Sequence, residues 1–167
     1  NGVQAGDSCL LAVFTDNSDD KSYPPGKRQY TLDFAYHGGI YRDVWMIAKS
    51  PVAITDAIDS QTVGGGGVFV HFDKISEKSA QVYVNTEVQN DDARFESVTV
   101  ETTLTDADGK VIKRSLGKLS LKPGEKKSIR QQMEVKNPTL WSPDTPYLYR
   151  VQSRIKKGNK SIDGGIT

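Results

Sequence analysis

The sequence predicts an all-β protein whose larger part is a sandwich of the immunoglobulin type. Val, Ile and Thr number 37 among the 167 residues, whereas Ala and Leu number 18, and branching at Cβ favours strands over helices. Apolar residues recur at every second position, which is typical of half-buried antiparallel strands. Short segments rich in Gly, Asp and Pro separate these runs, as hairpins require.

Alternation and turn residues together predict seven strands from residue 66 onward. The turns are expected at Asn90-Asp91-Asp92, at Asp106–Lys110, where Gly109 can take a positive φ, and at Lys122–Glu125. Seven short strands in about 100 residues indicate a two-sheet sandwich without the cysteine pair of antibody domains. The expected strands lie near residues 66–76, 79–90, 95–106, 110–121, 126–135, 146–157 and 160–166.

Residues 1–54 read differently from the rest of the chain. Strands are expected around Leu10–Phe14, at Tyr30–Phe34 and at Val44–Ile47. So few strands cannot form a β domain alone, which indicates the tail of a larger domain over 1–54, a linker over 55–66 and the sandwich over 67–167. The open edges of the first segment are expected to pair with another copy or to dock on the second domain.

Composition excludes several classes of protein. The formal net charge is +1, which disfavours a strongly basic nucleic-acid module, and no stretch approaches the roughly 20 apolar residues of a membrane span. The single cysteine, Cys9, excludes an internal disulfide framework. The compartment stays open between a periplasmic or secreted location and the cytoplasm, because a large β domain needs no disulfides and the chain begins with Asn-Gly rather than Met.

Two motifs carry a resemblance to a known family. The first is Asp33-Phe-Ala-Tyr-His-Gly-Gly-Ile-Tyr-Arg-Asp-Val-Trp45 and the second is Asn137-Pro-Thr-Leu-Trp-Ser-Pro-Asp-Thr-Pro-Tyr-Leu-Tyr149. In this order and about 100 residues apart, they resemble glycoside hydrolase family 2, which includes β-galactosidases, β-glucuronidases and β-mannosidases. The first motif resembles the end of the family's sugar-binding jelly-roll domain, and the second lies late in the immunoglobulin-like domain that follows.

The resemblance implies a fragment of a larger, β-galactosidase-like enzyme. In the family, a (β/α)8 barrel with two catalytic glutamates follows, and this chain stops before it. The implied partners are a β-linked glycoside, the protein's own catalytic barrel and another copy in a homo-oligomer, with no nucleic acid, membrane or cofactor. The alternatives are a stand-alone carbohydrate-binding module and a purely structural immunoglobulin-like spacer.

Asp33 is the candidate substrate-binding residue, in the full enzyme only. The resemblance implies that the Asp at this position reaches the sugar pocket of the barrel, where a carboxylate accepts strong hydrogen bonds from sugar hydroxyls. The alternative is a turn-capping Asp before Gly38 and Gly39. No catalytic residue is predicted, because most of the six glutamates fall in turns or in polar phases of strands, where solvated surface charges are expected, and none matches a catalytic motif. The isolated chain is therefore expected to be inactive.

The remaining candidates are interpreted mainly as structural. Trp45 is expected in the core and Trp141 as the anchor of a long loop, with stacking on sugar rings as the alternative for both. Arg42 is expected to be paired, and His37 to be an exposed loop residue. No metal site is predicted, because Asp106-x-Asp108-Gly109 and the acidic run from Asp16 lack the closing ligand of a calcium loop. The eight Lys and Arg residues between 110 and 130 indicate a solvated sheet face.

Overall fold

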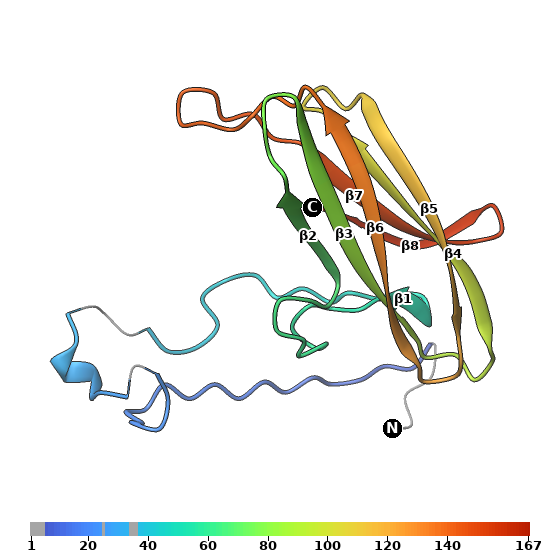
Figure 1. Cartoon of the computed structure of the whole chain (residues 1–167). Coiled ribbons are helices and arrows are strands. Elements are labelled where there is room, and N and C mark those ends of the chain that lie inside the picture. Colours follow the sequence, from blue (N-terminus) through green and yellow to red (C-terminus); the bar gives the residue numbers. More distant parts are fainter. Residues whose placement is uncertain (1–5, 25, 34–36) are drawn as a thin grey trace. The chain divides into compact units, whose positions relative to one another are not determined.

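The structure, a computed structural model, describes residues 6–24, 26–33 and 37–167. The chain divides into two compact units, Asn1–Ile47 and Ala48–Thr167. All eight strands of the described residues belong to the second unit, and the described part of the first has a single short 3-10 helix (Figure 1). No helix among the described residues is long and apolar enough to cross a bilayer.

The second unit is an antiparallel two-sheet sandwich, as the sequence predicts. In the first sheet, β3 (Ser79–Asn90) pairs with β6 (Lys126–Lys136) on one side. On its other side, β3 pairs with β2 (Val68–Asp73) over the full length of β2 and with β1 (Val52–Ile54) near Asn90. The second sheet has the order β5-β4-β7-β8, with the following bounds: β4, Glu96–Thr105; β5, Val111–Leu121; β7, Arg150–Lys157; β8, Lys160–Ile166. All seven strands predicted from residue 66 onward are thereby confirmed.

The predicted turns connect these strands. Gly109 (φ +84°) closes the β4–β5 hairpin and Gly124 (φ +72°) closes the turn between β5 and β6, both in the left-handed region that glycine adopts without steric cost. The β5–β6 connection carries the chain from the second sheet to the first. A longer loop, 137–149, carries it back from β6 to β7.

The core lies between the two sheets and follows the predicted alternation. In β3 every second side chain is buried from Ala80 to Asn90, and Val84, Val88, Val100 and Ile155 have no exposed surface. Two apolar clusters result, one toward the β1 end of the sandwich and one toward the β6–β7 loop. Burial of this many branched side chains supplies the main favourable term for folding.

Several buried polar groups inside the sandwich are hydrogen-bonded to one another or to the backbone, whereas the buried Thr86 hydroxyl has no partner among the described residues. The Asn90 side chain is fully buried and donates to the carbonyl oxygens of Arg94, Leu121 and Lys122 at 2.8, 3.2 and 3.1 Å. Between the sheets, the Thr102 hydroxyl donates to the Gln131 side-chain oxygen at 2.6 Å. These bonds fix the register of the sheets, because an unpaired buried polar group is costly.

The sandwich begins at β1, inside the segment that the sequence assigned to the first domain. Val52–Ile54 are all buried, and they pair with Val88–Asn90 of β3. The Ile54 amide also donates to the Asp163 carboxylate of β8 at 2.7 Å, which links the two sheets at this side. Tertiary pairing of so short a strand is invisible in the sequence, since three residues cannot show a period.

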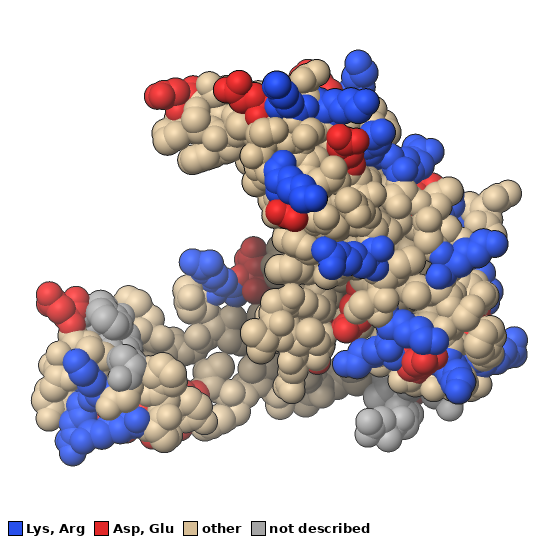
Figure 2. All heavy atoms as spheres, in the orientation of Figure 1, with Lys and Arg blue, Asp and Glu red and all other residues tan. Residues whose placement is uncertain are grey.

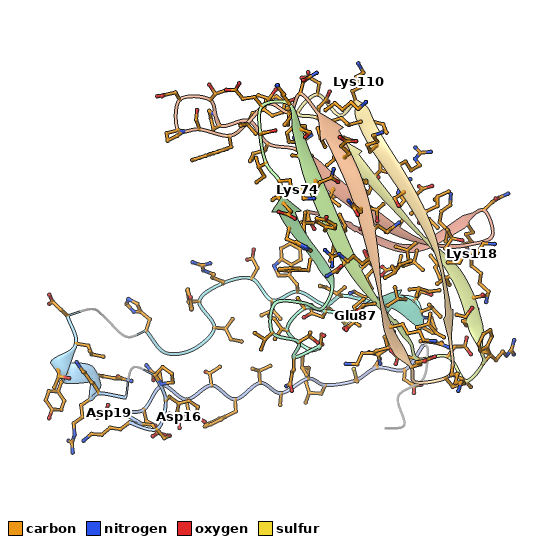
Figure 3. All side chains as sticks on the ribbon, viewed as in Figure 1. Asp16, Asp19, Lys74, Glu87, Lys110 and Lys118 are labelled. Atoms are coloured by element: carbon orange, nitrogen blue, oxygen red, sulfur yellow. The ribbon has the colours of Figure 1, made fainter. Side chains whose placement is uncertain are left out.

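The glycine-rich stretch expected as a linker is an ordered loop of the sandwich. One carboxylate oxygen of Glu87, on β3, accepts hydrogen bonds from the hydroxyls of Thr55 and Ser60 at 2.8 and 2.7 Å (Figure 3). The Gly67 amide donates to the Thr55 hydroxyl, and its φ of +57° suits glycine. The loop therefore returns to β2 along a defined path.

The described part of the first unit forms none of the strands that the sequence predicts there. Among its described residues, Leu10–Phe14 and Val44–Ile47 form no strand, and Gln29–Thr31 forms a 3-10 helix instead; Phe34 lies outside the described residues. Leu10 and Phe14 are 96% and 89% exposed. An alternating pattern becomes a strand only when a neighbouring strand accepts its backbone hydrogen bonds, and the described part of this unit offers none.

Candidate functional site

The Asp33 segment is solvent-exposed. Asp33 follows the 3-10 helix Gln29–Thr31 and Leu32 directly, and no hydrogen bond or ion pair engages its carboxylate among the described residues. Residues 34–36, between Asp33 and the turn at Gly38, lie outside the described part. An unengaged, exposed carboxylate is free to accept hydrogen bonds from a ligand.

The other residues of the first motif are also exposed. His37 is exposed, as predicted. Trp45 is 80% exposed, so the prediction that it belongs to the core is wrong. The Arg42 guanidinium lies 5.4 Å from the ring centroid of Tyr41, a cation–π contact in place of the expected ion pair. Trp45 lacks a core to enter because the described part of this unit contains no paired strands.

The second motif forms the loop 137–149, and two tyrosines secure it. The Tyr149 hydroxyl accepts a hydrogen bond from the Thr139 amide at 2.8 Å, and the Tyr147 hydroxyl accepts one from Ala107 at 3.3 Å. Trp141 remains 59% exposed, so the loop anchor is the tyrosine pair rather than the predicted tryptophan. A phenol hydroxyl can reach a backbone amide across the loop while its ring packs on the core.

Four of the six glutamates have defined structural partners. Glu96 and Glu101 are under a tenth exposed and pair with Lys157 and Lys156 of β7 at 2.6 and 3.4 Å. Their burial corrects the expectation of solvated surface charges, and it arises because long neighbouring side chains cover the central strand β4. Glu87 holds the 55–67 loop, and Glu125 binds a backbone amide in the β5–β6 turn.

The Glu125 carboxylate illustrates how the turn acts on ionisation. It accepts a hydrogen bond from the Lys122 amide at 2.7 Å and pairs with the Lys127 ammonium at 3.0 Å. The backbone hydrogen bond, reinforced by Lys127, lowers the pKa of Glu125 below its ordinary value of 4.5. Hydrogen bonds to the charged form favour that form.

The acidic loop of the first unit shows the same effect. Asp16 and Asp20 accept hydrogen bonds from the amides of Ser18 and Ser22, both at 2.8 Å, and these bonds lower the pKa of each carboxyl below 3.8. Asp19 accepts a bond from the Gln29 amide (Figure 3). Within the described residues, no group of three or more His, Cys, Asp or Glu is placed to hold a metal ion.

The eight basic residues between 110 and 130 are exposed and lie on β5, on β6 and in the turns on either side of β5. Figure 2 shows Lys and Arg side chains across the visible face with acidic side chains among them. Lys127 is engaged by Glu125 and by the Ser120 carbonyl. Exposed basic residues on the edge strands β5 and β6 keep these edges soluble.

Sequence reasoning missed a stack of side chains on the outer face of the first sheet. The Tyr83 ring of β3 lies between the Arg130 guanidinium of β6, 4.3 Å from its centroid, and the His71 ring of β2, 5.0 Å away and nearly parallel. Phe69 extends the stack, 5.8 Å from His71. Strands β4, β5, β7 and β8 contain no aromatic residue. The signal available in the sequence was the occurrence of aromatic residues in the polar phase of two neighbouring strands.

The stack is a poor platform for sugars. A sugar ring packs on an open aromatic face, whereas the Tyr83 ring is approached from both neighbouring strands, by Arg130 and by His71. Its chemistry is that of a packed patch of Arg, Tyr, His and Phe, a composition enriched where proteins meet.

Comparison with known proteins identifies the relatives of the chain. A family model described as glycosyl hydrolases family 2 matches residues 66–165. The chain is 39% identical over 129 residues to a β-glucuronidase of Formosa agariphila, covering 76% of this chain and 13% of that protein. It is 31% identical over 154 residues to the β-galactosidase BoGH2A of Bacteroides ovatus, covering 92% and 16%.

Solved structures of glycosidases also match the chain. A putative β-galactosidase from Bacteroides fragilis matches with a TM-score of 0.80 and 28% identity, covering 92% of this chain and 22% of that one. The β-glucuronidase of Bacteroides uniformis matches with a TM-score of 0.78 and 28% identity, covering 91% and 17%. The chain thus spans less than a quarter of the length of each of these relatives. Because the family model matches residues 66–165, which is more than half of the chain, the chain belongs to glycosyl hydrolases family 2.

Proposed function

We propose that this chain is a noncatalytic, N-terminal part of a larger retaining β-glycosidase. The observation that carries the proposal is the family match over residues 66–165 in a chain that spans only 13% and 16% of two curated glycosidase relatives. The sandwich would act as scaffolding beside a catalytic (β/α)8 barrel that supplies the two carboxyl groups. Retaining hydrolysis requires such a pair about 5–5.5 Å apart.

The experiment compares the 167-residue chain with the full reading frame that encodes it. We expect the 167-residue chain to release no product from aryl β-glycosides, and the full-length protein to turn them over. Circular dichroism of the short chain provides the control for folding. Hydrolysis by the purified short chain at an enzyme-like rate would contradict the proposal.

The sugar that the full enzyme cleaves is proposed as a β-galactoside or a β-glucuronide. The resemblance of the two motifs favoured a β-galactosidase-like enzyme, and the relatives include proteins of both names. Assays of the full-length protein on matched aryl β-galactoside and aryl β-glucuronide distinguish the two. A preference for a third sugar would contradict both proposed substrates.

For Asp33 we propose contact with a sugar hydroxyl in the full enzyme. Its support is an exposed carboxylate that no described residue engages. Charge-assisted hydrogen bonds contribute about 1.5–3 kcal/mol, so Asp33→Asn should lower kcat/KM by roughly 10- to 150-fold. Asp43→Asn, in the same exposed motif, is the matched control and should leave kcat/KM within about twofold. Equal losses in the two variants would show that Asp33 has no special role.

For the first unit we propose that it belongs to the end of the family's sugar-binding jelly-roll domain. The support is its alternating apolar sequence with exposed side chains, such as Leu10, Phe14 and Met46, which further strands of that domain would cover. In the full-length protein, the Trp45 fluorescence maximum should therefore lie at shorter wavelength than in the 167-residue chain. Trp45→Phe in both proteins isolates its contribution from that of Trp141.

A further inference from the structure

Strand β2 is an uncovered edge of the first sheet. It pairs with β3 alone, and among the described residues nothing else forms backbone hydrogen bonds with Val68–Asp73. Phe69 and Phe72 are 36% and 59% exposed. An uncovered edge presents a row of N–H and C=O groups that can pair with another strand.

The longer edge strands of the sandwich differ in how they resist pairing; besides β2 they are β6 in the first sheet and β5 and β8 in the second. β5, one edge of the second sheet, carries Lys113, Arg114 and Lys118, and lysine on an edge strand disfavours a further strand. β2 reads Val-Phe-Val-His-Phe-Asp and contains no Lys, Arg, Pro or bulge. β6 and β8 also contain lysine, so β2 alone of these four edge strands carries no Lys or Arg.

The backbone of β2 determines which residues face the open edge. The Glu87 amide donates to the Gly67 carbonyl at 2.9 Å, which makes residues 67 and 87 a hydrogen-bonded pair. Hydrogen-bonded and non-hydrogen-bonded pairs alternate along an antiparallel ladder. Phe69 and His71 therefore direct their backbone groups toward β3, whereas Val68, Val70 and Phe72 direct theirs toward the open edge.

We propose that β2 pairs antiparallel with β2 of a second copy of this chain, about a two-fold axis at Val70. In this register, Val70 opposes the partner's Val70 and Val68 opposes the partner's Phe72, so that the inward row is entirely apolar. On the outer face, Phe69 opposes the partner's His71. About six backbone hydrogen bonds would form, all from the groups that face the open edge. A two-fold contact is self-complementary, as this register requires.

The side chains favour this register over one with its axis at His71. An axis at His71 would place Phe69 opposite the partner's Asp73, an unfavourable cross-strand pair, whereas the axis at Val70 pairs aromatic with aromatic. It also joins the stack of Arg130, Tyr83, His71 and Phe69 to the same stack of the second copy. The contact would thus run across the outer faces of both first sheets.

The first test is sedimentation of the 167-residue chain over a range of concentrations. We expect a monomer–dimer equilibrium. Phe69→Lys places a cation on the proposed edge and should raise the dimer dissociation constant more than tenfold. Leu116→Lys makes the same change at a 63% exposed position on β5 and should leave the constant unchanged. A wild-type monomer, or a dimer that Phe69→Lys leaves intact, overturns the proposal; the second result would assign association to another surface, such as the first unit.

The second test reads the register directly and does not depend on a destabilising variant. In a Cys9→Ser background, Phe69→Cys and His71→Cys chains are mixed and oxidised. Opposed positions of a non-hydrogen-bonded pair lie about 4.5 Å apart at Cα, within reach of a disulfide. The mixed disulfide should dominate over either homodimer, and equal yields of all three would overturn the register. Neither test uses a substrate, so its failure leaves the proposed glycosidase function untouched.

Discussion

The two units of the chain carry the same alternating sequence pattern and differ in what it becomes. In Ala48–Thr167 the alternating residues form paired strands around a buried core. In the described part of Asn1–Ile47 they form no strand, and most large apolar side chains are exposed. The difference shows that period two specifies which face would be buried, whereas a hydrogen-bonded neighbour decides whether a strand forms.

Amide hydrogen exchange should give the largest contrast between the units. Amides in the central strands β3 and β4 are hydrogen-bonded on both sides of each strand, so they should exchange more than about 1,000-fold slower than those of residues 6–24 and 40–47. Mass spectrometry of peptic fragments measures both at once. Comparable protection in the two units would mean that the first unit has partners of its own.

Two matched leucine-to-alanine substitutions compare how much each unit contributes to the free energy of unfolding. Leu104 is 2% exposed in the core, and Leu10 is 96% exposed in the first unit. Leu104→Ala should lower the free energy of unfolding by about 3 kcal/mol through lost burial and a residual cavity. Leu10→Ala should change it by less than about 0.5 kcal/mol. Urea titrations followed by circular dichroism compare the two, and similar losses would show that Leu10 is buried in solution.

Two asparagines on β3 test the role of buried hydrogen bonds within the sandwich. Asn90 donates to three carbonyl groups, so Asn90→Ala should lower the free energy of unfolding by about 2 kcal/mol. The Asn85 side-chain oxygen is buried without a partner, so Asn85→Ala should cost less than about 0.5 kcal/mol. Thermal denaturation ranks the two variants, and the reverse order would contradict this assignment.

The smallest expected effect is on carboxylate pKa values. Their titration tests whether the local turns of the first unit persist without a core. Asp16 and Asp20 in the first unit and Glu125 in the second all have a pKa lowered by backbone hydrogen bonds. A lowered folded-state pKa stabilises above the unfolded value, and this contribution is lost as the pH falls through the folded value. NMR titration should place Glu125 below 4.5 and both Asp residues below 3.8. Ordinary values for Asp16 and Asp20 alone would show that their turns are not populated.

Most of the sandwich could be predicted from the sequence because its strands are long and amphipathic. β3 alternates through twelve residues, and turn residues bracket it. The predicted start of β7 near residue 146 was too early, since strand pairing begins at Arg150. Tyr147 and Tyr149 keep the apolar phase of the strand, yet their hydroxyls bind loop amides instead. The position of a tyrosine in the alternating pattern alone does not show whether it belongs to a strand or anchors a loop.

The candidate sites were harder to predict because they depend on contacts between distant residues. The stack of Arg130 on Tyr83 requires β6 to lie beside β3 in one register, 47 residues apart in sequence. The burial of Glu96 and Glu101 likewise depends on lysines of β7. Asp33 was found only through the resemblance of its motif, because an exposed carboxylate leaves no periodic signal.

The link between Ile54 and Asp163 has a geometric consequence for any longer chain. It holds the first strand of the sandwich against the last one, so the two strands through which the polypeptide enters and leaves this domain are in contact. Segments attached before β1 and after β8 would therefore be connected through this contact. Tension between those segments would act on the contact between β1 and β8, and the internal strands of the sandwich would not carry it.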